Sequence, residues 1–244
     1  MAGFILALQF FTGLPINKNI DFTKKNLRAC FFFLPFIGLL FGAVTASIMY
    51  VCHEPSLSSL LAVAAYIILG GSLHLDGLAD CADGFAAHTE SEKTLAIMSD
   101  PHAGTFAAIA IILDVLFRFV LYQLLQLQPL LLIVPPVLAR ITVLFVIAHG
   151  TPAKKTGLGS AFHTAISRLC FPLYFILIVL CFAAAIYFSI LPIHFIAIPF
   201  INWAIAALIM HYAQKRIGGT TGDINGATVE ILELNTLLFC TIFF

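Results

Sequence analysis

The sequence predicts an all-α, polytopic integral membrane protein, built as a bundle of six to seven transmembrane helices. Hydrophobic residues occupy 61% of its 244 positions, and charged residues occupy only 10%. Soluble domains carry about 25% charged residues, so this composition excludes an ordinary soluble domain. Several apolar runs also approach or reach the roughly 20 residues that a helix needs to cross a bilayer.

Six apolar runs are long enough to be predicted as spans. They cover residues 31–51, 57–73, 104–124, 130–148, 171–190 and 193–210. A seventh run, residues 227–244, contains Glu230 and Glu233, so we expect it to cross only as a short helix or one partly covered by protein. The first run, residues 4–16, is too short to span and contains a glycine and a proline, which favours an interfacial or re-entrant segment.

Lys and Arg residues are concentrated in alternate connections between these runs. Only Arg118 and Arg140 lie inside predicted spans. The connections that carry no Lys or Arg are 52–56, 125–129 and 191–192. The positive-inside rule then places the N-terminus and the basic loops in the cytoplasm. We therefore expect a multi-pass protein of the cytoplasmic (inner) membrane.

The long polar loops all fall on this cytoplasmic side. They cover residues 74–101, 150–168 and 215–230, whereas the opposite side has only short connectors. We expect one active site at the cytoplasmic end of the bundle. Since no soluble domain or linker is recognisable, residues 1–244 are expected to form a single membrane-embedded catalytic domain.

The first polar loop carries three regularly spaced aspartates, Asp76, Asp80 and Asp83. If residues 75–85 are helical, the three carboxylates share a sector of about 60° on one face. Carboxylates this crowded resist ionising together unless a positive charge lies between them. Oxygen ligands without His or Cys favour Mg²⁺ or Mn²⁺ over zinc. We therefore expect a divalent cation here, against the alternative of a solvated acidic loop.

Two further residues of this loop have two interpretations each. His74 would point away from the carboxylate sector on a continuous helix, so it either closes the second span or contacts a substrate. Asp100 lies in a turn before the third span. It either caps the following helix or brings another carboxylate back to the first cluster.

The other two polar loops combine glycines with charged residues. Lys154 and Lys155 stand among three glycines and form a candidate phosphate cradle, although the spacing is not that of a Walker loop. Lys pairs at the end of a span are also ordinary determinants of topology. In the third loop, Asp223 and Glu230 lie at i and i+7, on nearly one helical face, so a second carboxylate group reaches the same side. An acidic first helical turn would also explain Asp223.

Three charged residues fall within predicted spans. Each costs about 2.5–3.5 kcal/mol at a helix centre on insertion scales, so partners are expected. Asp114 and Arg118 stand at i and i+4 and are predicted to form an ion pair. Arg140 has no local acid, which makes it the better candidate for holding a phosphate.

Four segments carry a family resemblance. They are GGSLHLDGLADCADG (70–84), IMSDPHAGT (97–105), GLGSAF (157–162) and GGTTGDINGATVEILE (218–233). Together they resemble the cobalamin synthase family of adenosylcobinamide-GDP ribazoletransferases. LALQFFTGLPI and FLPFIGLLFGA near the N-terminus also look like this family, so the resemblance covers nearly the whole chain. His102 stands where Arg is usual, which puts a phosphate clamp in that turn in doubt, and Asn225 stands where an apolar residue is common.

The resemblance implies a Mg²⁺-dependent membrane enzyme. It would transfer the phosphocobinamide moiety of adenosylcobinamide-GDP to α-ribazole, or to its 5′-phosphate, and release GMP in the last steps of cobalamin biosynthesis. Asp76, Asp80 and Asp83 would be the catalytic and metal-binding carboxylates. With the arguments above, the expected substrate-binding residues are His74, Asp100, Arg118, Arg140, Lys154, Lys155, Asp223 and Glu230. Membrane lipid is the other expected partner, nucleic acid is not expected, and homo-oligomer formation is left open.

Two functions of other classes serve as alternatives. A CDP-alcohol phosphotransferase of lipid synthesis also uses clustered aspartates at a membrane surface, but Asp80 falls where the Ala-Arg of its motif would begin. A cation transporter would place acidic residues along a path near the bilayer midplane. Here only Asp114 lies deep inside a predicted span, and this distribution disfavours transport.

Overall fold

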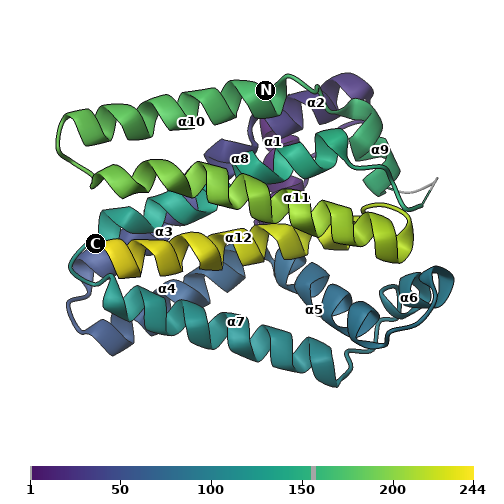
Figure 1. The fold of residues 1–244 in the computed structure, drawn as a ribbon, viewed down its shortest axis with the longest axis horizontal. Coiled ribbons are helices and arrows are strands. Elements are labelled where there is room, and N and C mark those ends of the chain that lie inside the picture. The colour runs from purple at the N-terminus through teal and green to yellow at the C-terminus, as the bar shows by residue number, and fades with distance from the viewer. Residues whose placement is uncertain (1, 155–157) are drawn as a thin grey trace.

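The computed structural model describes residues 2–154 and 158–244 of the chain (Figure 1). Within these residues the chain forms twelve α-helices and two short 3-10 helices and contains no β-strand, which confirms the predicted all-α class. The helices are α1 (Ala2–Phe11), α2 (Lys24–Phe32), α3 (Leu34–Val51), α4 (Pro55–Gly70), α5 (Leu73–Ala86), α6 (Ser91–Ile97), α7 (Thr105–Leu124), η1 (Pro129–Ile133), α8 (Val134–His149), α9 (Leu158–Ala165), α10 (Cys170–Tyr187), η2 (Ile193–Ala197), α11 (Ile198–Ile217) and α12 (Gly222–Phe243).

Six helical segments of the described chain are long and apolar enough to cross a membrane. They are α3, α7, η1 with α8, α10, η2 with α11, and α12. Counting the bent pair of α4 and α5 as one more span raises the number to seven. The chain is therefore a multi-pass helical membrane protein, as predicted.

The predicted span at residues 57–73 is the main departure from expectation. Helix α4 has only 16 residues and ends at Gly70. Gly71 and Ser72 follow with positive φ angles of 58° and 61°, in the left-handed region where a helix ends. Helix α5 then leaves at 88° to α4. The prediction of one continuous span here was wrong, because the glycines interrupt the apolar run.

The last helix is longer than the predicted apolar run. We expected a short or partly covered segment at residues 227–244, whereas α12 starts at Gly222 and runs for 22 residues. Its most apolar stretch is 56% buried inside the protein, so the expected covering by protein is present. Of the two alternatives predicted, the partly covered helix is the one formed, because Glu230 and Glu233 both have arginine partners on other helices.

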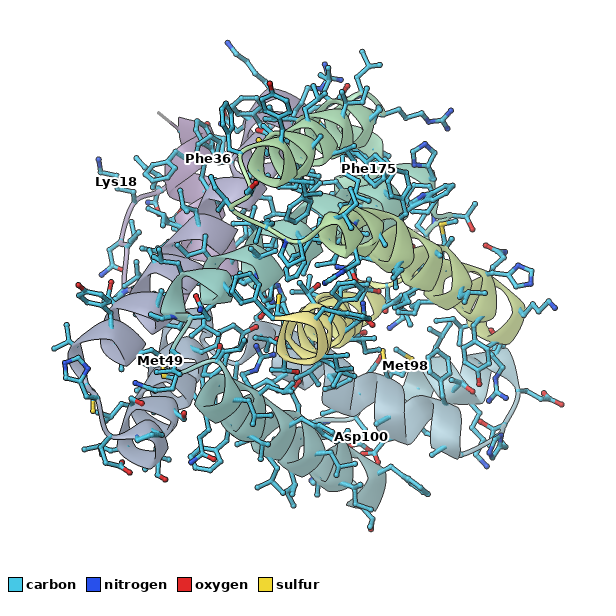
Figure 2. All side chains as sticks on the ribbon, turned by 60° about the vertical axis from the view of Figure 1, so that its left-hand side comes forward. Lys18, Phe36, Met49, Met98, Asp100 and Phe175 are labelled. Carbon is cyan, nitrogen blue, oxygen red and sulfur yellow. The ribbon has the colours of Figure 1, made fainter. Side chains whose placement is uncertain are left out.

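Helices α8 and α12 form the centre of the bundle. The span that contains α8 is 72% buried, whereas that of α10 is 17% buried and lies at the periphery. Figure 2 shows α12, in yellow, surrounded by the other helices. Large apolar side chains such as Leu116 and Leu173 remain exposed on outer helices, as expected for contact with lipid.

The two ends of the bundle differ. In Figure 1 the C-terminus and the short connection from α10 to α11 lie at the left, and α5, α6 and α9 lie at the right with the long polar loops. At the N-terminus, α1 is too short to span and packs closely on α2, where Gly3 faces Ala29. A break at Phe33 separates α2 from α3, so the first long helix begins at Leu34 rather than at residue 31.

Candidate active site

Two glycines bring α5 and α12 into close contact. A Cβ atom added to Gly77 would lie 2.8 Å from the carbonyl oxygen of Asp223. A Cβ atom added to Gly226 would lie 3.2 Å from the Cα of His74. Small residues at a helix crossing permit this backbone approach. The crossing brings the first turn of α12, with Asp223, beside the aspartates of α5.

The aspartates of α5 lie on a helix, as their spacing predicted. Helix α5 is not one of the six helices that are long and apolar enough to cross a membrane. Partial burial, and then the negative charges of Asp76, Asp223 and Asp83, raise the pKa of Asp80 to about 6. Among the described residues, no Lys or Arg forms an ion pair with Asp76 or Asp80. These carboxylates therefore form an acidic group without a neutralising partner in the described part of the chain.

The carboxylate of Asp83 contacts the start of α7, unlike those of Asp76 and Asp80. Its carboxylate oxygens accept hydrogen bonds from the backbone N–H of Gly104, at 2.6 Å, and of Ala107, at 2.9 Å. These are free N–H groups at the start of α7, where a carboxylate is favoured by the helix dipole. Asp83 thus caps α7 from another helix. The geometry does not support the predicted equivalence of Asp83 with Asp76 and Asp80 as a metal ligand.

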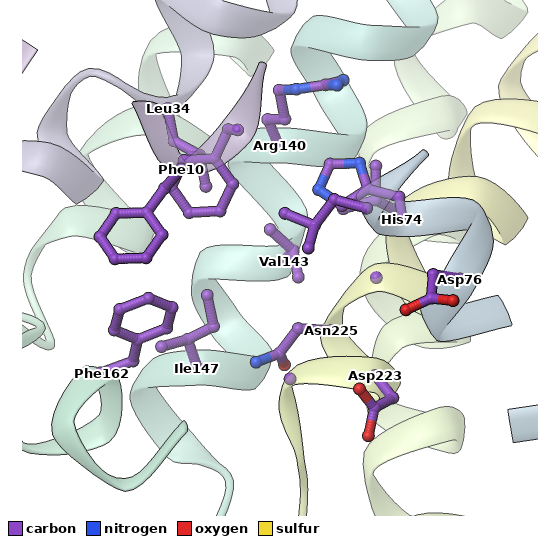
Figure 3. Close-up of a pocket in the computed structure, with 15 residues that line it drawn as sticks. Phe10, Leu34, His74, Asp76, Arg140, Val143, Ile147, Phe162, Asp223 and Asn225 are labelled. Atoms are coloured by element: carbon purple, nitrogen blue, oxygen red, sulfur yellow. The ribbon is translucent and has the colours of Figure 1, made fainter. Parts of the chain in front are cut away.

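A cavity of about 180 Å³ opens beside this crossing (Figure 3). It lies between the N-terminal turns of α5 and α12 on one side and α1, α8 and α9 on the other. Its lining residues are Phe10, Phe11, Leu34, Leu73, His74, Asp76, Arg140, Val143, Ile147, Phe162, Gly222, Asp223, Asn225, Gly226 and Val229. In Figure 3, Asp76 and Asp223 lie on one side, and Phe10 and Phe162 lie on the opposite side. The cavity therefore has an acidic end and an aromatic end.

Two buried side chains that line the cavity carry polar atoms without a hydrogen-bond partner in the described structure. They are Oδ1 of Asn225, and Nε and Nη2 of Arg140. Buried polar groups are nearly always paired, because an unpaired one costs about 1–3 kcal/mol. Unpaired groups in a cavity are consequently candidates for contact with a ligand.

Arg118 and Glu230, two of the predicted substrate-binding residues, are buried together in the bundle. The Nη2 of Arg118 donates to Glu230 at 2.6 Å, and its Nη1 donates to Glu233 at 2.8 Å. Its Nε lies 3.4 Å from Asp114, which confirms the predicted ion pair. Tyr66 donates to Glu230 at 3.2 Å and stacks under the guanidinium of Arg118, 4.0 Å away. Neither Arg118 nor Glu230 lines the cavity, so their positions do not support direct contact with substrate.

Arg140 joins this charged network to the cavity. Its Nη1 donates to Glu233 at 2.6 Å and to the carbonyl of Pro136 at 3.1 Å. The remaining N–H groups are the unpaired ones that face no protein acceptor in the described chain. Of the two intramembrane arginines, Arg140 lines the cavity and Arg118 does not.

His74 also stands between the network and the cavity. It lines the cavity beside Asp76, and its Nδ1 lies 3.9 Å from Oε1 of Glu230. Burial, and then the positive charge of Arg140, lower the pKa of His74 to about 3, so the imidazole is neutral near pH 7. This position agrees with a substrate contact rather than with a role confined to closing the preceding helix.

The loops after α8 and α11 are paired with each other near the start of α12. The N–H of Thr220 donates to Thr151 at 2.7 Å, and the N–H of Ala153 donates to Thr220 at 3.0 Å. This pairing holds Lys154 close enough to Asp223 for their charges to interact. Its Nζ donates to Ser99 at 2.8 Å. The three polar loops thus meet at one end of the bundle, as expected, while Lys155 lies outside the described residues.

Asp100 remains in its own turn. Its carboxylate accepts hydrogen bonds from the backbone and ring nitrogens of His102, at 2.9 Å and 2.7 Å, and these bonds lower the pKa of Asp100. It is exposed and does not line the cavity. The loop does return to the acidic group, but through the backbone of Gly104 rather than through Asp100.

Sequence reasoning missed the aromatic end of the cavity. Phe10, Phe11 and Phe162 lie in segments that carry the family resemblance, but none of them was predicted to line the site. Phe10 and Phe162 pack edge to face, with ring centroids 5.5 Å apart. No local signal identifies such a pair, because 24 phenylalanines are spread along this chain.

The acidic end agrees only in part with a divalent-cation site. Among the described residues, no group of three or more His, Cys, Asp or Glu side chains is arranged to hold a metal ion. Mg²⁺ in phosphate-transfer sites usually takes one or two carboxylates together with phosphate oxygens and water. Asp76 and Asp80, with Asp223 opposite, can supply this smaller ligand set, whereas Asp83 is committed to α7.

Comparison with known proteins gives a consistent result. A family model described as Cobalamin-5-phosphate synthase matches residues 3–241. A curated protein from Treponema denticola, named adenosylcobinamide-GDP ribazoletransferase, is 37% identical over 252 residues, covering 97% of this chain and 96% of the relative. A protein of the same name from Clostridium kluyveri is 32% identical, with 98% and 96% covered. One from Clostridium botulinum is 34% identical, with 96% and 95% covered. No solved structure matches the chain significantly.

Proposed function

Because the chain belongs to the cobalamin-5-phosphate synthase family, we propose that it is an adenosylcobinamide-GDP ribazoletransferase of cobalamin biosynthesis. The reaction joins the phosphocobinamide moiety of adenosylcobinamide-GDP to α-ribazole, or to its 5′-phosphate, and releases GMP. This function replaces the two alternatives, a CDP-alcohol phosphotransferase and a cation transporter.

One observation supports placing the reaction in the cavity beside the crossing of α5 and α12. The crossing of α5 and α12 places Asp76 and Asp223 on the same cavity, and the other end of that cavity is lined by aromatic rings. Phosphoryl transfer needs positioning and charge neutralisation more than covalent catalysis. A cavity that combines carboxylates, an arginine and apolar walls supplies both.

The chemical step follows from these groups. A ribose hydroxyl oxygen attacks the phosphorus attached to the corrinoid arm, and the bond from this phosphorus to the oxygen of GMP breaks. The hydroxyl proton passes to a carboxylate, for which Asp76 is placed best because it lines the cavity and has no ion-pair partner among the described residues. The free N–H groups of Arg140 and the ammonium of Lys154 hold phosphate oxygens.

We propose that one or two of the carboxylates of Asp76, Asp80 and Asp223 hold Mg²⁺ together with phosphate oxygens of the substrate. When bound, Mg²⁺ neutralises and orients phosphate oxygens. The support for this proposal is the oxygen-only donor set and the raised pKa of Asp80, which comes first from burial and then from the repulsion of the neighbouring carboxylates.

The proposed location is the cytoplasmic membrane, with the cavity facing the cytoplasm. The multi-pass helices and the distribution of basic residues support it, since Lys154 lies in the loop after α8, and Lys215 and Arg216 lie in the last turn of α11, at the same end of the bundle.

The test is a direct assay. Purified protein in detergent or nanodiscs is incubated with adenosylcobinamide-GDP, α-ribazole and Mg²⁺, and GMP release and formation of the joined corrinoid are followed by liquid chromatography. Both products are expected in equal amounts. Reactions that lack α-ribazole control for simple hydrolysis of the diphosphate, and absence of GMP from the complete reaction would refute the proposal.

A further inference from the structure

The aromatic end of the cavity has the form of a binding slot. Phe10 and Phe11 reach it from α1, and Phe162 reaches it from α9. Phe162 is held in place by Phe31, with ring centroids 5.2 Å apart at an interplanar angle of 89°. Ile147 of α8 closes the side facing α12. The walls therefore come from three separate parts of the chain and are fixed by packing around the opening.

Figure 3 shows Asn225 between Ile147 and Asp223, at the border between the apolar walls and the acidic end. It is buried, and its Oδ1 has no partner in the described structure. An amide offers both a donor and an acceptor, and leaving it unpaired in an apolar setting is unfavourable. This arrangement favours a ligand that is flat and apolar and carries a hydrogen-bonding atom on its ring edge.

The size of the cavity limits what it can hold. An apolar cavity of about 150 Å³ accommodates a single benzene ring. The cavity here is about 180 Å³, so it suits one small aromatic ring system and not a corrin macrocycle. The macrocycle of the donor must therefore lie outside this slot.

We propose that the slot formed by Phe10, Phe162, Ile147 and Asn225 binds the heteroaromatic base of the ribazole nucleoside. This inference rests on the proposed function. The base packs against the two phenylalanine rings, and the Nδ2–H of Asn225 donates a hydrogen bond to the unsubstituted ring nitrogen, which is an acceptor. The ribose then extends toward the acidic end of the cavity, where Asp76 receives the proton of the attacking hydroxyl.

The guanine base of the donor is the competing occupant. Guanine presents a carbonyl, a ring N–H and an amino group along one edge, and burying these groups without partners is unfavourable. The other polar residues that line the cavity are His74, Asp76, Arg140 and Asp223. In Figure 3, His74, Asp76 and Asp223 lie away from Phe10 and Phe162, whereas Arg140 lies at the top of the view near Leu34 and Phe10. Beside Ile147 the polar side chain is the single amide of Asn225, which suits a base with one polar edge atom.

The experiment measures KM for α-ribazole and KM for adenosylcobinamide-GDP separately in each variant. In Asn225→Leu, which keeps the side-chain size but removes the amide, KM for α-ribazole is expected to rise about tenfold, the equivalent of one lost hydrogen bond to a buried group. In Phe162→Ala, a rise of similar size is expected. KM for adenosylcobinamide-GDP is expected to stay within twofold in both. Phe188→Ala, an exposed phenylalanine beyond the end of α10, is the matched control and should change neither KM.

A direct binding experiment tests this inference independently of the proposed function. Free benzimidazole is titrated into wild-type protein and into Ile147→Trp, in which the larger side chain fills the slot. Size-exclusion chromatography verifies that each variant is folded. Saturable binding to the wild type, lost in Ile147→Trp, supports the slot even in a preparation that releases no GMP. If the wild type releases GMP but the variants raise KM for adenosylcobinamide-GDP instead, or leave both KM values unchanged, the inference is wrong while the proposed function stands.

Discussion

The carboxylate of Asp83 accepts a hydrogen bond from the backbone N–H of Gly104 at 2.6 Å. Its second oxygen accepts the N–H of Ala107, so one side chain of α5 satisfies two free donors at the start of α7. Gly104 is required at this contact, because a Cβ there would lie 2.8 Å from the carboxylate oxygens. The relationship separates Asp83, which joins two helices, from Asp76, which lines the cavity.

Asp83→Ala is therefore expected to reduce stability more than chemistry. Loss of an N-terminal cap costs about 0.5–2 kcal/mol. Thermal unfolding in detergent should show a lower midpoint, and the folded fraction should retain measurable GMP release. Asp83→Asn, which keeps one acceptor oxygen, should lie between Ala and the wild type. A variant of normal thermal stability without any activity would show that Asp83 acts directly on the substrate.

Asp76→Asn is expected to abolish GMP release while the protein stays folded. The substitution removes the proposed proton acceptor and one cation ligand, for which a loss of about 100-fold or more in kcat is expected. Glu92→Gln on α6 is the matched control, since Glu92 is exposed and does not line the cavity. Near-normal turnover of Asp76→Asn would contradict both roles.

Removal of divalent cations is expected to stop the reaction. Dialysis against EDTA should abolish GMP release, and Mg²⁺ or Mn²⁺ should restore it, because the available ligands are carboxylate oxygens. Zn²⁺, which prefers nitrogen and sulfur ligands, should not restore it fully. Activity that survives complete chelation would refute the proposed Mg²⁺ site.

Helical periodicity predicted the acidic group of α5 correctly, because a spacing of i, i+4 and i+7 is a local property of the chain. It did not predict that Asp83 serves α7, since the partner amides are 21 and 24 residues away. The same limit applies to Arg118. The sequence identified Asp114 one turn away, but the shorter hydrogen bonds go to Glu230 and Glu233, which are 112 and 115 residues distant.

Most of the long helices were predicted well, including η1 with α8, whose span is 72% buried. Hydropathy identified α7 and α10, whose surfaces are mostly exposed. It undervalued α12, because a scale that treats each charge as unpaired takes no account of arginines on neighbouring helices. It also extended the second span to residue 73, past the left-handed turn at Gly71 and Ser72, where α4 has already ended.

Arg118→Gln is expected to destabilise the bundle strongly. It leaves Glu230, Glu233 and Asp114 without their shared guanidinium, and breaking a buried ion pair costs about 3–5 kcal/mol. Arg118→Met combined with Glu230→Gln keeps the net charge of the network and should recover part of the lost stability. Arg168→Gln, at an exposed position, should change stability by less than about 0.5 kcal/mol. Thermal midpoints in one detergent provide the comparison. Equal midpoints for Arg118→Gln and Arg168→Gln would show that the network does not stabilise the fold.

Asp80 makes the stability of the protein depend on pH. Its pKa is about 6 in the folded protein, against an ordinary value of 3.8, because burial and neighbouring carboxylates disfavour its charge. Between these values the folded state binds more protons than the unfolded state, so the free energy of unfolding falls as pH rises from about 4 to about 6 and stays reduced above it. Asp80→Asn removes this repulsion. Without divalent cations, its thermal midpoint should exceed that of the wild type at pH 8, and the difference should shrink as pH is lowered toward 4.

Added Mg²⁺ offers the complementary measurement for Asp80. By neutralising the carboxylates, it should raise the midpoint of the wild type at pH 8 and narrow the gap to Asp80→Asn. The Glu92→Gln variant controls for the loss of one acidic residue at an exposed position. A midpoint for Asp80→Asn that is below the wild type at pH 8, or a gap that does not change with pH, would mean that the repulsion among Asp76, Asp80 and Asp223 is already relieved inside the protein. The proposed reason for a cation at this site would then be lost.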